Sequence, residues 1–280
     1  VTGSPAANAL ARDADLVLAV GTRLQDFTTG SNSLFTQARI LGLNVQALDA
    51  AKNADATLVA DAQVGLTQLT QQLAGWQADA AWTGRGKTAF KGWNDLLDAH
   101  QKPTNAAVPT YAQVVGTVNR WAAPNDTMVT AAGGLPGETA KGWRIKNPNT
   151  YDLEFGFSAM GYEIAGGLGV KLAKPDDDIV VMLGDGSYMM ANSEIATSVM
   201  LGKKLTIVVL DNRGFGCINR LQMATGGANF NNLLRDSYQV VTPEVDFVAH
   251  ANSLGAMAEK VTSIADLETA LKRSKANDRT

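Results

Sequence analysis

Two stretches of the sequence decide the fold: Ile179-Val-Val-Met-Leu-Gly-Asp-Gly-Ser187 and Leu205-Thr-Ile-Val-Val-Leu-Asp-Asn-Arg-Gly214. Each is an apolar run of strand length that ends in a polar or glycine-rich turn, as expected of buried parallel strands. A helical segment over Ser193–Met200 separates them, which predicts a βαβ unit with a right-handed crossover. Both turns should therefore lie at the same carboxyl edge of one sheet, where α/β proteins bind ligands.

The residue types at this edge suit a hard divalent cation. Asp185 offers a carboxylate oxygen, Asn212 an amide oxygen and Gly214 a backbone carbonyl. Three protein oxygens leave room around Mg²⁺ for two phosphate oxygens and one water. Gly184 and Gly186 allow the main chain to approach a phosphate, and the following helix directs free N–H groups at it. A lone Gly-Asp-Gly is more often a plain turn, but its pairing with Asn212 favours the metal–phosphate interpretation.

The rest of the chain predicts an α/β protein with two doubly wound, Rossmann-like parallel-sheet domains, the first of them incomplete. Residues 1–76 begin abruptly, and only three strands are expected there, followed by an amphipathic helix over 62–76. Residues 77–108 are predicted to be a linker region with helical packing. Residues 109–280 form the second domain, which is expected to lack its last strand. The three strands expected in the first domain cover residues 15–21, 44–48 and 57–61.

Composition narrows the function. The chain has 280 residues and a net charge of −3, so no basic field for nucleic acid exists. Its single cysteine, Cys217, excludes an intrachain disulfide and a cysteine zinc cage, and two histidines exclude a His-rich metal site. No apolar run approaches the ~18 residues of a membrane span, and no secretion signal is visible. We therefore expect a cytoplasmic protein with a small-molecule ligand.

These motifs resemble the thiamine-diphosphate enzymes of the pyruvate decarboxylase and acetolactate synthase superfamily. In that family Gly-Asp-Gly is followed, after a gap in the mid-twenties, by what is usually Asn-Asn. Here the pair is Asp211-Asn212, and the departure falls on the position that is not the expected ligand. Met160 matches the bulky residue that holds the family's cofactor bent. The resemblance implies thiamine diphosphate and Mg²⁺ as cofactors, with residues 1–76 as the C-terminal half of a central domain and 109–280 as the diphosphate-binding domain.

Finer motifs resemble one branch of this superfamily, the hydrolases of inositol catabolism that open trihydroxycyclohexane-1,2-dione to 5-deoxyglucuronate. They lie at Gly21–Thr29, Ala132–Gly137, Met160–Gly166 and Asp211–Gln222. An acetolactate synthase-like carboligase or decarboxylase and a non-catalytic binding module stay open as alternatives. The resemblance further implies a homodimer or dimer of dimers for the full-length protein. It also implies an activating glutamate in an N-terminal domain without a counterpart here, so we expect no catalytic residue on this chain and no turnover by it alone.

Several further residues near the motifs allow two interpretations each. Ser187 either helps hold the diphosphate or caps a helix. Gly133 and Gly134 either present N–H groups to the cofactor or form a simple turn, and Phe215 either faces the thiazolium ring or packs in the core. The remaining polar residues are expected to be structural or solvated: Glu138, Glu154, Glu163, Glu194, His100, His250 and Cys217.

Overall fold

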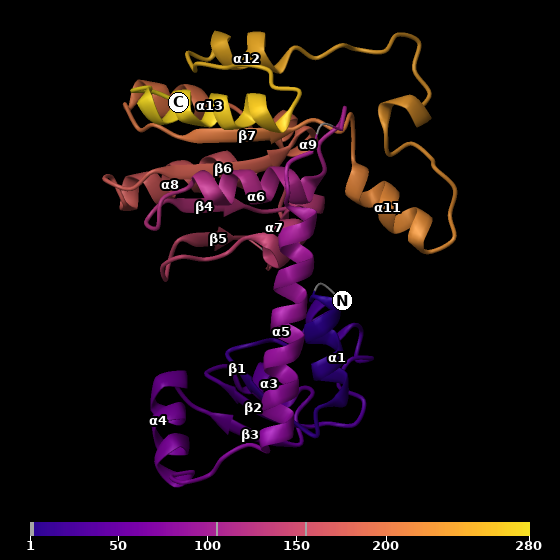
Figure 1. Ribbon diagram of the computed structural model, residues 1–280, viewed down its shortest axis with the longest axis vertical. Helices are drawn as coiled ribbons and strands as arrows, with labels where there is room; N and C mark the ends of the chain where they lie inside the picture. Colours follow the sequence, from indigo (N-terminus) through magenta and orange to yellow (C-terminus); the bar gives the residue numbers. More distant parts are fainter. Residues whose placement is uncertain (1–2, 105, 155) are drawn as a thin grey trace. The chain divides into compact units, whose positions relative to one another are not determined.

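The computed structural model describes residues 3–104, 106–154 and 156–280, and the chain divides into two compact units with the boundary between residues 99 and 100 (Figure 1). Each unit contains a parallel β-sheet with helices, so the predicted α/β class with two parallel sheets is confirmed. None of the helices in these ranges has the length and apolar character that a membrane span requires.

The first unit has a three-stranded parallel sheet in the order β1-β2-β3. The strand predicted over residues 44–48 is wrong, because β2 ends at Asn44 and a short helix begins at Ala47. That helix passes so close to β2 that the Ala50 carbonyl lies where a Cβ on Gly42 would stand, which explains a glycine inside a strand. The elements are α1 (Pro5–Asp13), β1 (Leu16–Val20), α2 (Asp26–Thr29), β2 (Arg39–Asn44), α3 (Ala47–Ala51), β3 (Ala56–Val59), α4 (Ala62–Gln72) and α5 (Ala80–His100).

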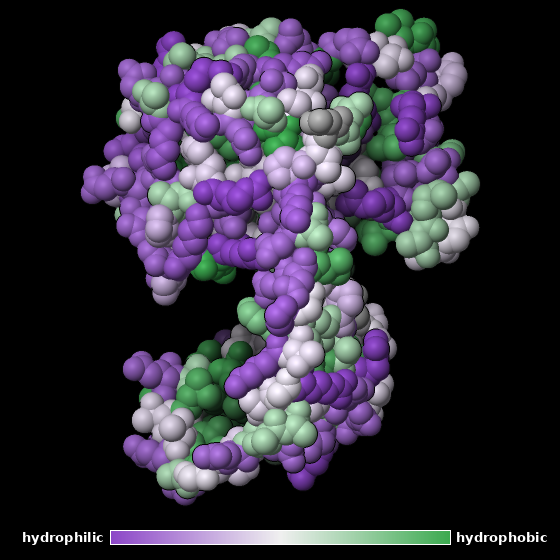
Figure 2. Space-filling model, viewed as in Figure 1, coloured by the Kyte–Doolittle hydropathy of each residue, from purple (hydrophilic) through white to green (hydrophobic). Residues whose placement is uncertain are grey.

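One face of this first sheet carries bare apolar side chains. The register places Leu16, Leu18 and Leu58 on the same side of the sheet, and these residues are 52%, 43% and 50% exposed. Figure 2 shows hydrophobic surface gathered in a hollow of this unit. Parallel sheets are ordinarily covered by helices on both faces. This open apolar face is in keeping with the sequence-based prediction of an incomplete first domain, which stays a prediction.

The second unit has a four-stranded parallel sheet in the order β5-β4-β6-β7. Its central strand β6 is buried along its apolar run, with residues 179–183 each exposed by 1% or less. The elements are α6 (Tyr111–Trp121), β4 (Thr127–Thr130), α7 (Gly134–Gly142), β5 (Tyr151–Leu153), α8 (Tyr162–Ala173), β6 (Ile179–Gly184), α9 (Asp185–Met190), α10 (Glu194–Met200), β7 (Thr206–Leu210), α11 (Gly216–Ala224), a 3₁₀ turn (Leu234–Asp236), α12 (Phe247–Ser253) and α13 (Ile264–Ala276).

Alternating side chains of this second sheet enter two separate hydrophobic clusters. Val180 and Met182 pack with α6, α7 and α13, whereas Val181 and Leu183 pack with α8, α9 and α10. The sheet is therefore covered on both faces, as in a doubly wound domain, and both faces are anchored by the strand that carries the Gly-Asp-Gly turn.

Two local features of the second unit differ from the sequence-based expectation. Gly133 and Gly134, for which a simple turn was one of two interpretations, instead begin helix α7, with Gly133 as its N-cap at φ +92°. A short strand, β5, was not expected, because Tyr-Asp-Leu is neither long nor uniformly apolar; it is held by parallel pairing with β4.

Candidate functional site

The two decisive turns meet at one edge of the second sheet. β6 and β7 are parallel neighbours, and their last paired residues are Gly184 and Leu210. The chain leaves both strands at this same carboxyl edge, directly into the Gly-Asp-Gly turn and the Asp-Asn turn. The sequence-based placement of the two turns is therefore confirmed.

Asp185 is the buried carboxylate of this edge. It is the first residue of α9 and only 7% exposed. Its Oδ2 accepts a hydrogen bond from the Gly214 amide at 2.8 Å, and its Oδ1 accepts from the Asn212 amide at 3.3 Å. Burial raises the pKa of the Asp185 carboxyl, and these two amides oppose the rise. A carboxylate that has lost water in this way gains by contact with a cation.

Asn212, whose backbone amide binds that carboxylate, has an unsatisfied side-chain oxygen. Its Nδ2 donates to the hydroxyl of Tyr111 at 2.9 Å, which fixes the orientation of the amide. Its Oδ1 is buried and has no hydrogen-bond partner among the described residues. Buried polar atoms are ordinarily paired, so an unpaired oxygen on the residue whose backbone amide binds a desolvated carboxylate fits the role of a cation ligand. The donor set thus fits Mg²⁺, which prefers oxygen ligands.

Gly214 completes the turn with a backbone that no side chain would tolerate. Its φ is +143°, and a Cβ there would stand 2.5 Å from the Asn232 carbonyl oxygen. The flanking residues are held by backbone hydrogen bonds, from the Phe215 amide to the Asn232 carbonyl at 2.7 Å and from the Leu234 amide to the Arg213 carbonyl at 2.9 Å. The turn that would supply a backbone ligand is therefore held in place by hydrogen bonds to the segment around Asn232 and Leu234.

Two of the predicted cofactor residues, Met160 and Phe215, lie against a third, Gly186. A Cβ on Gly186 would stand 3.0 Å from the Phe215 ring and 3.1 Å from the Met160 methyl group. Only glycine leaves room for both side chains over the main chain of the Gly-Asp-Gly turn. Phe215 is 42% exposed, so its ring lies at the site's surface and is not a core residue.

The start of α7 connects to the same site through two residues that the sequence did not single out. The Cα of Gly134 lies against the guanidinium of Arg220 in α11. Arg220 in turn lies over the ring of Tyr111, 5.6 Å from its centroid, and Tyr111 binds Asn212. Tyr111 and Asn212 are 101 residues apart in the chain, so no local pattern could have paired them.

Ser187 lies in the first turn of α9 and is 2% exposed. It is not the helix cap, because Gly184 occupies the N-cap position; that alternative is wrong.

In the described ranges no group of three or more His, Cys, Asp or Glu side chains could hold a metal. A metal at this edge would thus depend on one carboxylate and on neutral oxygens, which suits a ligand that brings its own phosphate charge.

The glutamates nearest the motifs bind backbone amides. Glu154 accepts from the Ala159 and Phe157 amides, and these hydrogen bonds lower the pKa of its carboxyl. Glu163 is fully buried and accepts from the amides of Ala132 and Gly161. Both therefore have structural partners, as the sequence analysis expected.

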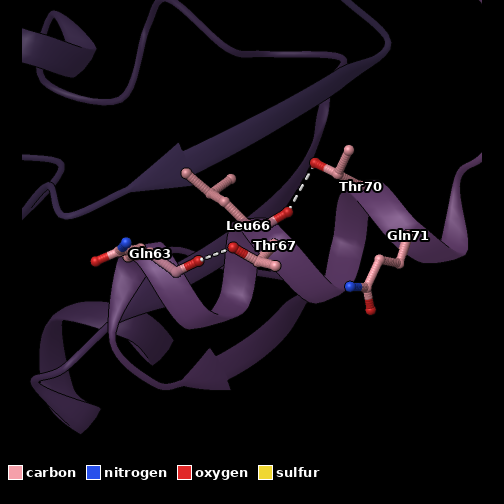
Figure 3. A pocket seen from close by; sticks show the side chains of 5 residues that line it. All are labelled: Gln63, Leu66, Thr67, Thr70 and Gln71. Atoms are coloured by element: carbon pink, nitrogen blue, oxygen red, sulfur yellow. Dashed lines mark hydrogen bonds between the residues drawn. The ribbon is translucent and has the colours of Figure 1, made fainter.

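A surface depression of about 450 Å³ lies elsewhere, on helix α4 of the first unit. Figure 3 shows its lining, five uncharged residues of one helix, with the Thr67 and Thr70 hydroxyls donating back to the carbonyls of Gln63 and Leu66. It offers no titratable side chain, so it is not a competing reaction site.

Parallel α/β units, one with Gly-Asp-Gly and Asp-Asn turns joined at a sheet edge, are the arrangement of thiamine-diphosphate enzymes. Residues 131–280 match the family model described as thiamine pyrophosphate enzyme, C-terminal TPP binding domain, and residues 1–69 match the central domain of the same enzymes. The chain belongs to the thiamine pyrophosphate enzyme family. Thiamine diphosphate is therefore the cofactor that its binding domain indicates, with Mg²⁺ the usual metal of the family.

The individual relatives point to one branch of this family. The chain is 38% identical to the 3D-(3,5/4)-trihydroxycyclohexane-1,2-dione hydrolase of Geobacillus thermodenitrificans, over 98% of this chain and 47% of the relative. It is 36% identical to hydrolase 2 of the same name from Bacillus cereus, over 98% and 48%, and 35% identical to the Bacillus anthracis hydrolase, over 97% and 47%. The chain spans about half the length of these curated relatives.

Proposed function

We propose that this chain is part of an enzyme that hydrolyses a carbon–carbon bond of a cyclic 1,2-dione, opening trihydroxycyclohexane-1,2-dione to 5-deoxyglucuronate. Its relatives with that hydrolase name align with nearly all of the chain. The observation that carries the proposal is the contact of Asp185 with Asn212, in which a desolvated carboxylate accepts from the backbone amide of a residue whose side-chain oxygen has no partner among the described residues. In this proposal the chain supplies the magnesium–diphosphate half of the site.

The residues of that half have distinct roles in the proposal. The Asp185 carboxylate, the Asn212 Oδ1 and the Gly214 carbonyl would hold Mg²⁺, while the amides at the start of α9 would face the diphosphate. Tyr111 keeps the Asn212 oxygen turned toward the metal by accepting from its Nδ2. The other residues proposed to contact the cofactor are Gly133, Gly134, Met160, Gly184, Gly186, Ser187 and Phe215.

When bound, thiamine diphosphate supplies the electron-accepting ring that makes cleavage next to a carbonyl feasible. The protein's contribution is to bind, orient and shield. Met160 and Phe215 pack over Gly186, so they place apolar surface next to the main chain that would carry the phosphates. The Asp185 carboxylate would be the one negatively charged protein ligand of Mg²⁺, because the diphosphate brings the other negative charges.

The acid–base group is proposed to lie outside these residues, on an N-terminal segment of the longer protein and facing this site from a partner copy in a homodimer or dimer of dimers. Two facts support this. The relatives are about twice as long as this chain, and Glu154 and Glu163, the glutamates beside the site, are engaged by backbone amides. The protein is proposed to act in the cytoplasm.

The test uses the longer protein in which we propose this chain lies. Calorimetry should show thiamine diphosphate binding that requires Mg²⁺; absence of binding would support a non-catalytic module. Supplied separately with the cyclic dione and with pyruvate, the enzyme should open the dione. Formation of acetolactate from pyruvate would overturn the substrate assignment. Ring opening by residues 1–280 alone would contradict the proposal that this chain supplies only the magnesium–diphosphate half of the site.

A further inference from the structure

Glu163 is a buried carboxylate that joins two loops of the site. It is the second residue of α8 and is 0% exposed. Its Oε2 accepts from the Gly161 amide at 2.9 Å, and its Oε1 accepts from the Ala132 amide at 3.3 Å. The first bond alone would be a local helix cap. The second reaches 31 residues back along the chain, to the end of β4.

Both amides bound by Glu163 belong to sharp backbone bends. Gly161 has φ +94°, and Ala132 directly precedes Gly133 at φ +92°. These are conformations that only glycine adopts without strain, so the surrounding structure must hold them. One carboxylate therefore fixes the direction in which the chain enters α7 and the direction in which it enters α8.

The residues next to these bends are proposed cofactor contacts. Gly161 follows Met160, whose methyl group lies on Gly186 of the Gly-Asp-Gly turn. Gly133 and Gly134, at the start of α7, follow Ala132. Glu163 itself lies beneath these residues, shielded from solvent, and is placed to set their separation rather than to touch a ligand.

We infer that Glu163 is a positioning residue of the cofactor site, which ties the Gly133–Gly134 loop to the Met160–Gly161 loop at the spacing that thiamine diphosphate requires. This inference rests on the proposed function. A carboxylate suits the task because both of its oxygens accept, whereas a glutamine presents one oxygen and one N–H₂ group. In Glu163→Gln one of the two amides would face a donor, and the loops would separate or rotate.

The test compares Glu163→Gln with Asp126→Asn in the longer protein. Asp126 is also a buried carboxylate, 7% exposed, and accepts from the Ala123 amide at 2.7 Å and from Lys275 at 3.1 Å. It immediately precedes β4, at the strand end opposite Ala132. Both variants remove a charge and an acceptor for a backbone amide, so both should lower Tm. Only Glu163→Gln should alter the cofactor loops.

Two readouts separate positioning from stability. By calorimetry with saturating Mg²⁺, the Kd for thiamine diphosphate should rise about tenfold in Glu163→Gln, equivalent to about 1.4 kcal/mol, and should stay nearly unchanged in Asp126→Asn. Hydrogen exchange without cofactor should quicken in peptides covering residues 131–134 and 159–162 in Glu163→Gln alone. If Glu163→Gln fails to fold, Glu163→Asp takes its place, since it keeps the charge but withdraws the carboxylate by one methylene group.

If the wild-type protein binds thiamine diphosphate and the folded Glu163 variant binds it with the same Kd, this inference is overturned and the proposed function is not. Equal effects of the Glu163 and Asp126 variants on Kd would also overturn it, because the effect would then follow from lost stability. Failure of the wild-type protein to bind thiamine diphosphate would instead overturn the proposed function, and this inference with it.

Discussion

Replacing Asp185 by asparagine should separate metal binding from folding. The proposed ion is shared with a diphosphate, which neutralises part of its charge, so the carboxylate faces about one net positive charge. At about 3 Å and an effective dielectric constant of about 20, such a pair attracts by about 5 kcal/mol. The asparagine oxygen keeps part of this attraction as a neutral ligand. We expect a net loss of about 3 kcal/mol, or roughly a hundredfold rise in the Kd for thiamine diphosphate with Mg²⁺.

The fold should tolerate the same change. Asp185 accepts from the amides of Gly214 and Asn212, and asparagine can satisfy one of them. The lost hydrogen bond costs about 1 kcal/mol, and removal of a carboxylate whose pKa burial has raised offsets it. Stability without cofactor should therefore change little at neutral pH.

The assay is calorimetry of cofactor binding beside thermal unfolding without cofactor, with Asp211→Asn as the matched control. Asp211 is an exposed neighbour whose charge raises the pKa of Asp185 without belonging to the donor set. Its variant should bind the cofactor nearly as the wild type does. Equal Kd values for Asp185→Asn and the wild type would refute the metal assignment, and a collapse of Tm would refute the separation of binding from folding.

Three further outcomes are expected. Tyr111→Phe removes the acceptor that orients Asn212, so cofactor binding should weaken about tenfold with a loss of about 1 kcal/mol of stability; a binding isotherm identical to wild type would contradict this role. Gly186→Ala should displace the Phe215 ring and weaken binding more than it lowers Tm, as paired calorimetry and melting curves would show. Because the pKa of Asp185 lies above its ordinary value of 3.8, acidification should protonate it, weakening Mg²⁺-dependent binding while this group's contribution favours the folded apo chain; a titration in which affinity rises toward acid pH would refute the assignment.

The sequence predicts strands β6 and β7 well because the signal is local. Both are apolar runs of strand length that end in a turn, and their parallel pairing brings the two turns to one edge, although β7 is a half-buried edge strand and only β6 is buried. The shifted strand β2 shows the limit of such patterns. Residues 44–48 largely alternate in polarity, yet the strand ends at Asn44 and helix α3 begins at Ala47. The alternation pattern does not reveal that α3 folds back onto β2, where the Ala50 carbonyl lies against Gly42.

The sequence analysis did not single out Tyr111 and Arg220, because their contacts at the candidate site also depend on tertiary packing. Tyr111 begins a helix in the linear pattern, and only the fold brings its hydroxyl to Asn212. Arg220 follows the Asp-Asn turn in α11, but its contact with Gly134 depends on the packing of α7. Residue type and spacing therefore predicted the expected ligands, whereas the residues that orient those ligands emerged from tertiary contacts.

Two buried carboxylates near this site have different proposed roles: Asp185 binds the metal, whereas Glu163 holds two loops in place. Glu163 has both oxygens engaged by main-chain amides of two loops and no exposed surface, so its hydrogen bonds support those loops. Asp185 also receives two amides, but its burial still raises its pKa, and one of those amides belongs to Asn212, whose side-chain oxygen has no partner among the described residues. A cation at Asp185 would supply the partner that the Asn212 oxygen lacks. Charge and burial alone would nominate either residue as a metal ligand; the unsatisfied neighbour selects Asp185.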